Sequence, residues 1–253
     1  CILRNLRKGV SHEIAGGAGG RHRCLQPQRA PAEARGHLAD QVRVAHAFSP
    51  SAARRDTFGQ KFPFPLADRL ETILDDPAVT AVAILSPANT HLEVARRAAQ
   101  AGKHVLLEKP IEITTARAEE LVRTCRDAGV TLGIVLQHRF RPAAQRLAGL
   151  LAEGALGQIV GCSTAVRLWR AQSYYDEPGR GSMARDGGGV LMSQAIHTLD
   201  LMLSLAGPIA EVRGFTATTP VHRMETEDLV CAAVRYENGA LGTIDATTAA
   251  FPG

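Results

Sequence analysis

The sequence of 253 residues has few aromatic side chains, an odd number of cysteines and no long apolar run. Aromatic residues make up 4% of the chain, so a surface of rings on which nucleobases stack is not expected. The five cysteines form no Cys-x-x-Cys pair, which argues against a disulfide framework and against a zinc site. Without a run of about 18 apolar residues or a signal-type segment, we expect a cytoplasmic protein with no membrane span.

An excess of one charge is also absent from most of the chain. The net charge of +4 comes from residues 1–40, which carry seven basic and three acidic side chains, and the rest is neutral. A chain body with no basic cluster is not expected to bind nucleic acid. With 45% hydrophobic and 21% charged residues, the composition predicts a globular protein of two modest domains or one large α/β unit.

Apolar runs alternate with helical segments from Gln41 onward, and this alternation is typical of a Rossmann-like parallel α/β sheet. The segments expected as strands are 42–48, 81–86, 104–107 and 130–136. Two helices are expected between them, 90–101 and 114–129, each ending at a glycine.

The pattern changes after Gln137, where a second α/β domain with a mainly antiparallel sheet is expected. Helices are predicted at 143–153 and 190–206, and strands at 158–169, 210–218, 228–236 and 241–248. Asn238-Gly239 between the last two strands is a strong hairpin signal. We therefore predict a parallel-sheet domain over residues 1–137 and a mainly antiparallel-sheet domain over residues 138–253.

Residues 1–40 do not fit the pattern of a first strand followed by a phosphate-binding loop. Glycines occur between Gly16 and Gly20, but no apolar strand of useful length precedes them, and Pro27 and Pro31 interrupt any following helix. A flexible Gly/Arg tail is the simpler reading of this segment. We expect that residues 1–40 form no normal first strand and that the affinity for a dinucleotide is therefore weakened. This pattern is the one expected if the chain is incomplete or misread in this segment.

Two polar motifs follow strands of the predicted parallel sheet, where open α/β sheets bind ligands. Ser86-Pro87-Ala88-Asn89-Thr90-His91 follows the strand at 81–86, and its alternative reading is an N-capped turn. Glu108-Lys109-Pro110 follows the strand at 104–107, and its alternative reading is a surface ion pair.

A third motif begins with three glycines and continues into an apolar helix. Ser193, His197 and Asp200 lie at helical spacing, so they share one face of this helix. A single histidine there would usually be a core residue. Three polar side chains on one face of the helix favour a functional site instead, because buried polar groups need partners and these three can supply one another.

These motifs, together with Gln137-His138-Arg139-Phe140, resemble the Gfo/Idh/MocA oxidoreductases over about residues 41–253. The resemblance implies a Rossmann-like dinucleotide-binding domain over residues 1–137 and a substrate-binding α/β domain with a large open sheet over residues 138–253, incomplete at its end. It also implies a homo-oligomeric enzyme that uses NAD or NADP on a sugar, cyclitol or related polyol. Lys109 and His197 would be the catalytic residues. The residues expected to line the cofactor site are Ser86, Pro87, Asn89, His91, Glu108, Gln137 and Arg139. Substrate contacts are expected from Ser193, Gln194 and Tyr175, and no metal is expected.

The expected chemistry is hydride transfer coupled to loss of a hydroxyl proton. The pKa of an alcohol, like that of water, lies far above that of histidine, and the mismatch corresponds to ~12 kcal/mol, so histidine alone is insufficient. Lys109 would stabilise the developing alkoxide, and His197 would accept the proton with its ring oriented by Asp200 or Ser193. The family often has Asp where Ser193 stands, which removes one assisting carboxylate.

Two questions stay open at the level of sequence. No carboxylate occurs at 47–49, where the adenosine ribose would be bound, and Ser49, Ser51, Arg54 and Arg55 slightly favour NADP over NAD. The alternative to an enzyme is a non-catalytic dinucleotide- or sugar-binding relative that acts as a sensor or scaffold.

Overall fold

The computed structural model describes residues 2–4 and 42–252 and divides into two compact units. Most of the first unit precedes Val135 and most of the second follows Ile134. Two loops that we assigned to the first domain, 87–90 and 109–118, group with the second unit. Both follow parallel strands, so the motifs at these strand ends are held by contacts within the second unit.

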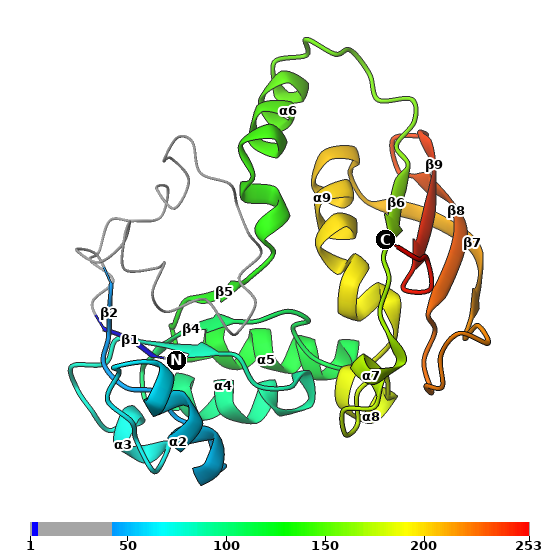
Figure 1. Ribbon diagram of the computed structural model, residues 1–253. Coiled ribbons are helices and arrows are strands. Elements are labelled where there is room, and N and C mark those ends of the chain that lie inside the picture. The colour runs from blue at the N-terminus through cyan, green and yellow to red at the C-terminus, as the bar shows by residue number, and fades with distance from the viewer. Residues whose placement is uncertain (1, 5–41, 253) are drawn as a thin grey trace. The chain divides into compact units, whose positions relative to one another are not determined.

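A five-stranded sheet forms the centre of the first unit (Figure 1). Its strands are β1 (Ile2–Arg4), β2 (Arg43–Val44), β3 (Ala81–Ile84), β4 (His104–Leu107) and β5 (Leu132–Ile134), in the order β2-β1-β3-β4-β5. β3, β4 and β5 are parallel, as predicted. β1 is antiparallel to both of its neighbours, unlike the first strand of a dinucleotide-binding sheet. The glycine-rich segment after it lies outside the described residues.

The strand expected at 42–48 is wrong beyond Val44. Since β1 has only three residues, β2 pairs with it at two positions and then leaves it. The backbone of Ala47 instead hydrogen-bonds to Pro65 and Ala67. The exposed helix α2 (Ala52–Lys61) follows. It buries no side chain, which is why hydrophobic periodicity did not reveal it.

Two amphipathic helices follow β3 and β4 as predicted. α4 (His91–Gln100) buries Leu92, Ala95 and Ala99, and α5 (Thr115–Asp127) buries Leu121 and Cys125. Both end before a glycine with positive φ, a conformation that glycine adopts without steric cost. A short 3-10 turn, η1 (Ala88–Thr90), precedes α4, and the single turn α3 (Glu71–Leu74) precedes β3.

The second unit contains a four-stranded sheet in the order β6-β9-β8-β7. β7 (Ile209–Ala217), β8 (Leu229–Tyr236) and β9 (Leu241–Thr247) are antiparallel, as predicted, and the β8–β9 turn has Gly239 at φ 86°. β6 (Thr164–Arg167) is parallel to β9 and shorter than the expected 158–169. The residues before it pair with β9 at a single isolated bridge, at Gly161, so no continuous ladder forms.

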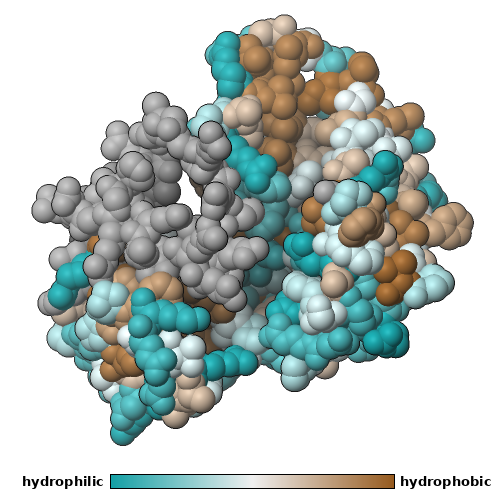
Figure 2. All heavy atoms as spheres, in the orientation of Figure 1, coloured by the Kyte–Doolittle hydropathy of each residue, from teal (hydrophilic) through white to brown (hydrophobic). Residues whose placement is uncertain are grey.

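Helical segments connect the strands of this unit. They are η2 (Gln137–Phe140), α6 (Pro142–Ala152), α7 (Gln172–Tyr175), α8 (Met183–Asp186), the π-turn η3 (Leu191–Ala195) and α9 (Ile196–Ala206). The surface view shows apolar residues gathered in the region of α6 (Figure 2). Of the residues in α6, only Ala144 is buried.

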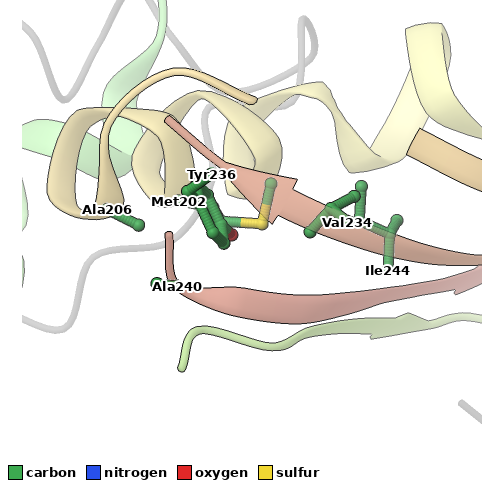
Figure 3. Packing of buried hydrophobic residues seen from close by; sticks show 6 residues of the cluster. All are labelled: Met202, Ala206, Val234, Tyr236, Ala240 and Ile244. Carbon is green, nitrogen blue, oxygen red and sulfur yellow. The ribbon is translucent and has the colours of Figure 1, made fainter. Parts of the chain in front are cut away.

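One face of the second sheet packs against α9. Met202 and Ala206 of α9 form a buried cluster with Val234, Tyr236 and Ile244 (Figure 3). Burying side chains of this size contributes roughly 1.5–3 kcal/mol each. This packing fixes the helix that carries His197 against a rigid sheet.

One helical stretch, Met183–Ala206, is long and apolar enough to cross a membrane when judged by length and composition. It comprises α8, the three glycines, η3 and α9, and its last part packs against the sheet. The core helix of a soluble protein passes the same test, so this is weak evidence for a membrane span.

Candidate active site

Lys109 and His197 are brought together within the second unit. Lys109 follows β4, and its Nζ donates a hydrogen bond of 2.6 Å to the backbone carbonyl of Ser193 in η3. Ser193 precedes His197 by four residues, which is about one helical turn. A π-turn in this helix is a feature that often occurs at functional sites. The structure therefore places an ammonium group beside the helix turn that carries the histidine.

His197 is electrostatically disfavoured as a cation. Burial, followed by the positive charge of Lys109 and smaller effects of His138 and Arg141, lowers the pKa of His197 to about 4, although the negative charge of Asp200 opposes the shift. Its Nδ1 atom is buried and has no hydrogen-bond partner among the described residues. At neutral pH the ring is therefore uncharged and can accept a proton.

The expectation that Asp200 or Ser193 orients His197 is wrong. Asp200 accepts two hydrogen bonds from Arg139, and Ser193 Oγ donates to the carbonyl of Gly189 at 2.7 Å. The neighbour of His197 is instead His138, whose ring centroid lies 5.2 Å from that of His197. Burial also lowers the pKa of His138, so both rings of this pair favour the neutral form.

The three glycines let the chain enter the helix through a crowded space. Gly187 has φ 75°, and a Cβ atom there would lie 2.5 Å from Ile113 Cα. A Cβ atom at Gly189 would lie 1.7 Å from the carbonyl oxygen of Glu227. The Glu227 carboxylate accepts hydrogen bonds from the backbone N–H groups of Gly189 and Leu191. This carboxylate satisfies donors at the start of the helix and was not predicted.

Of the expected substrate residues, Gln194 belongs to a polar group and Tyr175 does not. Gln194 accepts a hydrogen bond from Arg170 and donates to the hydroxyl of Tyr174. Tyr175 is 7% exposed, and its hydroxyl bonds to Thr248 at 2.7 Å. The assignment of Tyr175 to the substrate is corrected here, because adjacent residues of a helical turn point in different directions. Tyr174 takes the position near Gln194.

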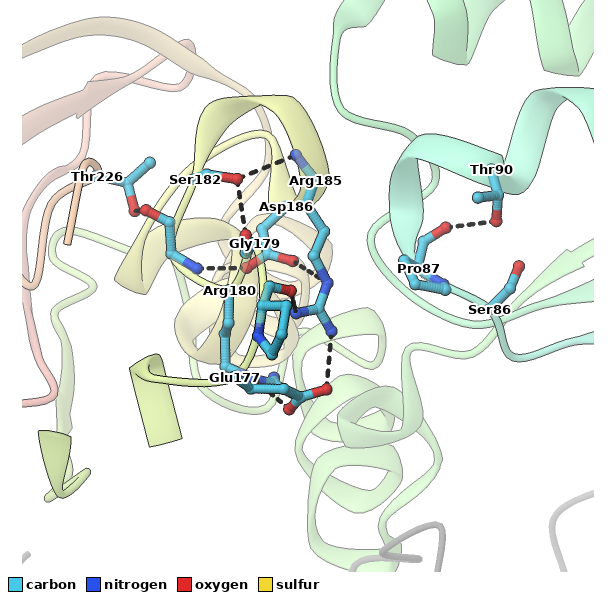
Figure 4. Close-up of polar contacts among 12 residues, drawn as sticks. Ser86, Pro87, Thr90, Glu177, Gly179, Arg180, Ser182, Arg185, Asp186 and Thr226 are labelled. Carbon is cyan, nitrogen blue, oxygen red and sulfur yellow. Dashed lines mark hydrogen bonds and ion pairs between the residues drawn. The ribbon is translucent and has the colours of Figure 1, made fainter. Parts of the chain in front are cut away.

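The loop after β3 has exposed Pro87 and Asn89. The Pro87 carbonyl accepts hydrogen bonds from the N–H and the hydroxyl of Thr90, which close the loop (Figure 4). His91 is fully buried, and its Nε2 bonds to the Ser86 carbonyl at 2.8 Å. A fully buried ring cannot line a cofactor surface, so the expectation that His91 contacts the cofactor is wrong. His91 instead holds the Ser86 carbonyl at the start of the loop.

The remaining expected cofactor residues lie on two segments. Glu108 is half-buried directly after β4, and Gln137 and Arg139 belong to η2. Arg139 is tied to Asp200 of α9, and its side chain is 47% exposed. Its guanidinium therefore fixes η2 to the histidine helix, and contact with a cofactor stays a prediction.

Two polar pairs that each contain a buried carboxylate were not predicted from the sequence. Glu112 is buried and accepts hydrogen bonds from Arg117 and from the backbone of Ile113, which fixes the loop after Lys109. His222 and Asp228 are both fully buried and lie 2.6 Å apart. The spacing of these residues matches no short motif, so the sequence offered no signal for them. No group of three or more metal-ligating side chains occurs in residues 2–4 and 42–252.

Comparison with known proteins supports one family for both parts of the chain. Residues 17–135 match an oxidoreductase family described as an NAD-binding Rossmann fold, and residues 144–253 match the Gfo/Idh/MocA C-terminal domain. The 1,5-anhydro-D-fructose reductase of Ensifer adhaerens is 33% identical over 72% of this chain and 55% of its own. The levoglucosan dehydrogenase of Pseudarthrobacter phenanthrenivorans is 27% identical over 70% of this chain and 51% of its own.

A solved structure shows the same fold. The WlbA dehydrogenase from Bordetella pertussis, in complex with NADH and UDP-GlcNAcA, has a TM-score of 0.79 and 31% identity over 85% of this chain and 62% of its own. The chain spans about half the length of the curated relatives it matches. Since both parts match domains of one family and the Lys109 and His197 motifs occur together, the chain belongs to the Gfo/Idh/MocA oxidoreductase family.

Proposed function

We propose that the chain is an NAD- or NADP-dependent oxidoreductase that acts on a CH–OH group of a sugar, cyclitol or related polyol. The observation that carries this proposal is the Lys109 ammonium held 2.6 Å from the Ser193 carbonyl, one turn before a neutral His197. A cation beside a neutral base is the arrangement that removal of a hydroxyl proton requires. The activities of the relatives named above are of the same class.

Lys109 and His197 have different roles in this proposal. The ammonium of Lys109 stabilises negative charge on the reacting oxygen, and His197 accepts the hydroxyl proton or returns it in the reverse direction. With a pKa of about 4, His197 binds a proton weakly, so stabilisation of the oxyanion by Lys109 is the larger requirement. Arg139 and Asp200 hold η2 against α9 and thereby fix the position of the histidine.

The chain has suitable positions for a nicotinamide cofactor. Exposed Pro87 and Asn89 follow one parallel strand and Glu108 follows the next, at the edge of the sheet where dinucleotides bind. When bound, the cofactor accepts or supplies the hydride. Ser51 caps α2, and Arg55 donates one hydrogen bond to the Ser49 carbonyl. The Ser51 hydroxyl and the other guanidinium donors of Arg55 form part of a binding site for the 2′-phosphate of NADP. The WlbA structure contains NADH, which supports NAD as the other choice.

The proposal is tested by following nicotinamide absorbance with both cofactors and a panel of sugars, anhydrosugars and cyclitols. Fluorescence titration with NADH and NADPH measures cofactor binding separately. Turnover that is lost in Lys109→Ala supports the enzyme. Cofactor or sugar binding without turnover of any panel member would contradict it and favour a sensor or scaffold. The Nδ1 atom of His197, which has no hydrogen-bond partner among the described residues, is the observation that favours the sensor or scaffold, because a catalytic histidine usually has an orienting partner.

We further propose that the chain forms homo-oligomers through the sheet face opposite α9. This face presents Phe215, Leu241 and Cys231, and the side chain of Phe215 is 86% exposed. Strand pairing places Phe215 beside Cys231 on this face. Exposed apolar residues on an open sheet are typical of association surfaces. The cytoplasmic location expected from the sequence stays a prediction.

A further inference from the structure

We propose that Arg170 forms a subsite for an anionic group, a carboxylate or a phosphate, on the substrate. The inference rests on the proposed function, because it names the class of sugar that the Lys109–His197 site accepts. Arg170 lies between β6 and α7 and is half-buried. Its guanidinium reaches Gln194, which follows the Ser193 carbonyl that binds Lys109.

The charge of Arg170 has no counter-ion in the described part of the chain. Its side chain donates one hydrogen bond to the Trp169 carbonyl and one to Gln194 Oε1. A guanidinium has five N–H donors, so three have no protein acceptor there. By contrast, the nearby Arg180 and Arg185 both pair with Glu177 (Figure 4). A half-buried arginine without a carboxylate is a position where an anionic ligand gains a charge-assisted hydrogen bond.

The backbone at Arg170 is held rigidly. Its N–H donates to the Thr248 carbonyl at 2.9 Å, and its carbonyl bonds to His222 Nε2 at 2.8 Å. His222 is itself fixed by the buried Asp228. This pair, which the proposed chemistry does not use, therefore acts as the support of the subsite. Rigid support matters because a displaced guanidinium loses the geometry of a two-point contact with an anion.

The surroundings of the guanidinium also favour an anion close to the reacting groups. The Arg170 guanidinium lies 5.4 Å from the centroid of the Tyr174 ring, and the Arg180 guanidinium lies 4.2 Å from it. The Tyr174 hydroxyl bonds to both Arg180 and Gln194. Gln194 is three residues before His197, so its hydrogen bond joins the Arg170 guanidinium to the helical turn before the histidine.

Calorimetric titration of the full chain with D-glucuronate, D-glucose 6-phosphate and D-glucose tests this inference. We expect one of the charged sugars to bind at least about tenfold more tightly than glucose, since a hydrogen bond to a charged group is worth that much. Preference for glucuronate would identify a carboxylate site, and preference for the 6-phosphate a phosphate site. Arg170→Gln should remove the preference, and Arg170→Lys should retain part of it.

The matched control is Arg126→Gln, which removes an exposed arginine of α5. It should leave all three affinities unchanged. Equal binding of the three sugars by the native chain, no binding of either anion, or a preference that survives in Arg170→Gln would overturn the inference. Nicotinamide absorbance assays on the same samples separate the two proposals. Anion binding through Arg170 without turnover contradicts only the proposed function, whereas turnover of a charged sugar that Arg170→Gln does not change contradicts only the subsite.

Discussion

The residue that defines the chemistry of this site is a histidine that resists protonation. Burial and the nearby Lys109 charge lower the pKa of His197 to about 4 from an ordinary value of 6.5. The imidazole is therefore neutral throughout the physiological range and available as a base. The Lys109 ammonium, bonded to the Ser193 carbonyl one turn before the histidine, contributes to this shift by its charge.

Titration of His197 by NMR should give a pKa near 4 in the native chain. In Lys109→Met the pKa should rise, because loss of a positive charge favours the protonated ring. Arg126→Gln should leave it unchanged. A native pKa near 6.5, or one that does not respond to Lys109→Met, would show that the lysine and the histidine are not coupled.

The same shift predicts how stability depends on pH. Between about pH 6.5 and pH 4 the unfolded chain binds a proton at residue 197 that the folded chain does not bind. The free energy of unfolding should therefore fall as the pH falls through this window, and His197→Asn should show a shallower fall. Urea unfolding of both proteins at several pH values measures the difference. Parallel curves would contradict the assigned pKa.

Ser193→Asp tests whether a carboxylate at this position, which the family often has, assists proton transfer to His197. Aspartate at this position would lie one turn before His197, and its negative charge should raise the pKa of the histidine. A stronger base should then give a higher kcat, with a smaller change in KM. Ser193→Asn, which adds the same bulk without charge, is the control. If both variants behave alike, charge at residue 193 has no role in proton transfer.

At the scale of elements, entry into the catalytic helix depends on the contact between Gly189 and Glu227. Gly189→Ala should destabilise the protein by about 2 kcal/mol or more, because its Cβ would overlap the backbone carbonyl of Glu227. Gly149→Ala in α6 is the control. A Cβ there would meet only Glu153 Oε1, at 4.0 Å, so the variant should be neutral or stabilise the protein by up to about 1 kcal/mol. Equal melting temperatures for the two variants would show that the helix entry can shift freely.

Elements with a strong apolar pattern could be predicted from the sequence, and those without one could not. The parallel strands β3 to β5 and the β8–β9 hairpin were predicted because buried runs and Asn238-Gly239 are local signals. α2 was not predicted because it has no buried face. The strand at 42–48 was predicted to be longer than β2 is, because its partner β1 is short. The motifs predicted that Lys109 lies near the helix of His197, and Lys109 bonds to the Ser193 carbonyl of that helix, whereas no local pattern encodes the contacts of Glu227 and Arg170.

At the scale of the whole molecule, the exposed sheet face predicts association. Phe215→Glu should convert an oligomer into monomers, because it would bury a charge without a partner where the native chain presents an exposed aromatic ring. Val122→Glu on α5 places the same charge at another exposed apolar position and should have no effect. Sedimentation velocity at micromolar concentration measures both. A native chain that is strictly monomeric would contradict the proposed interface.

The central claim is that Lys109 and His197 act on one substrate hydroxyl. A double-mutant cycle of Lys109→Ala and His197→Ala, measured as kcat/KM with a substrate identified by the absorbance assay, tests it most directly. Each single variant should lose about 10²- to 10⁴-fold, and the double variant should lose little more than the worse single one, because groups that act as a unit are not additive. Losses that multiply, or turnover that survives both substitutions, would show that the two residues do not form one catalytic pair.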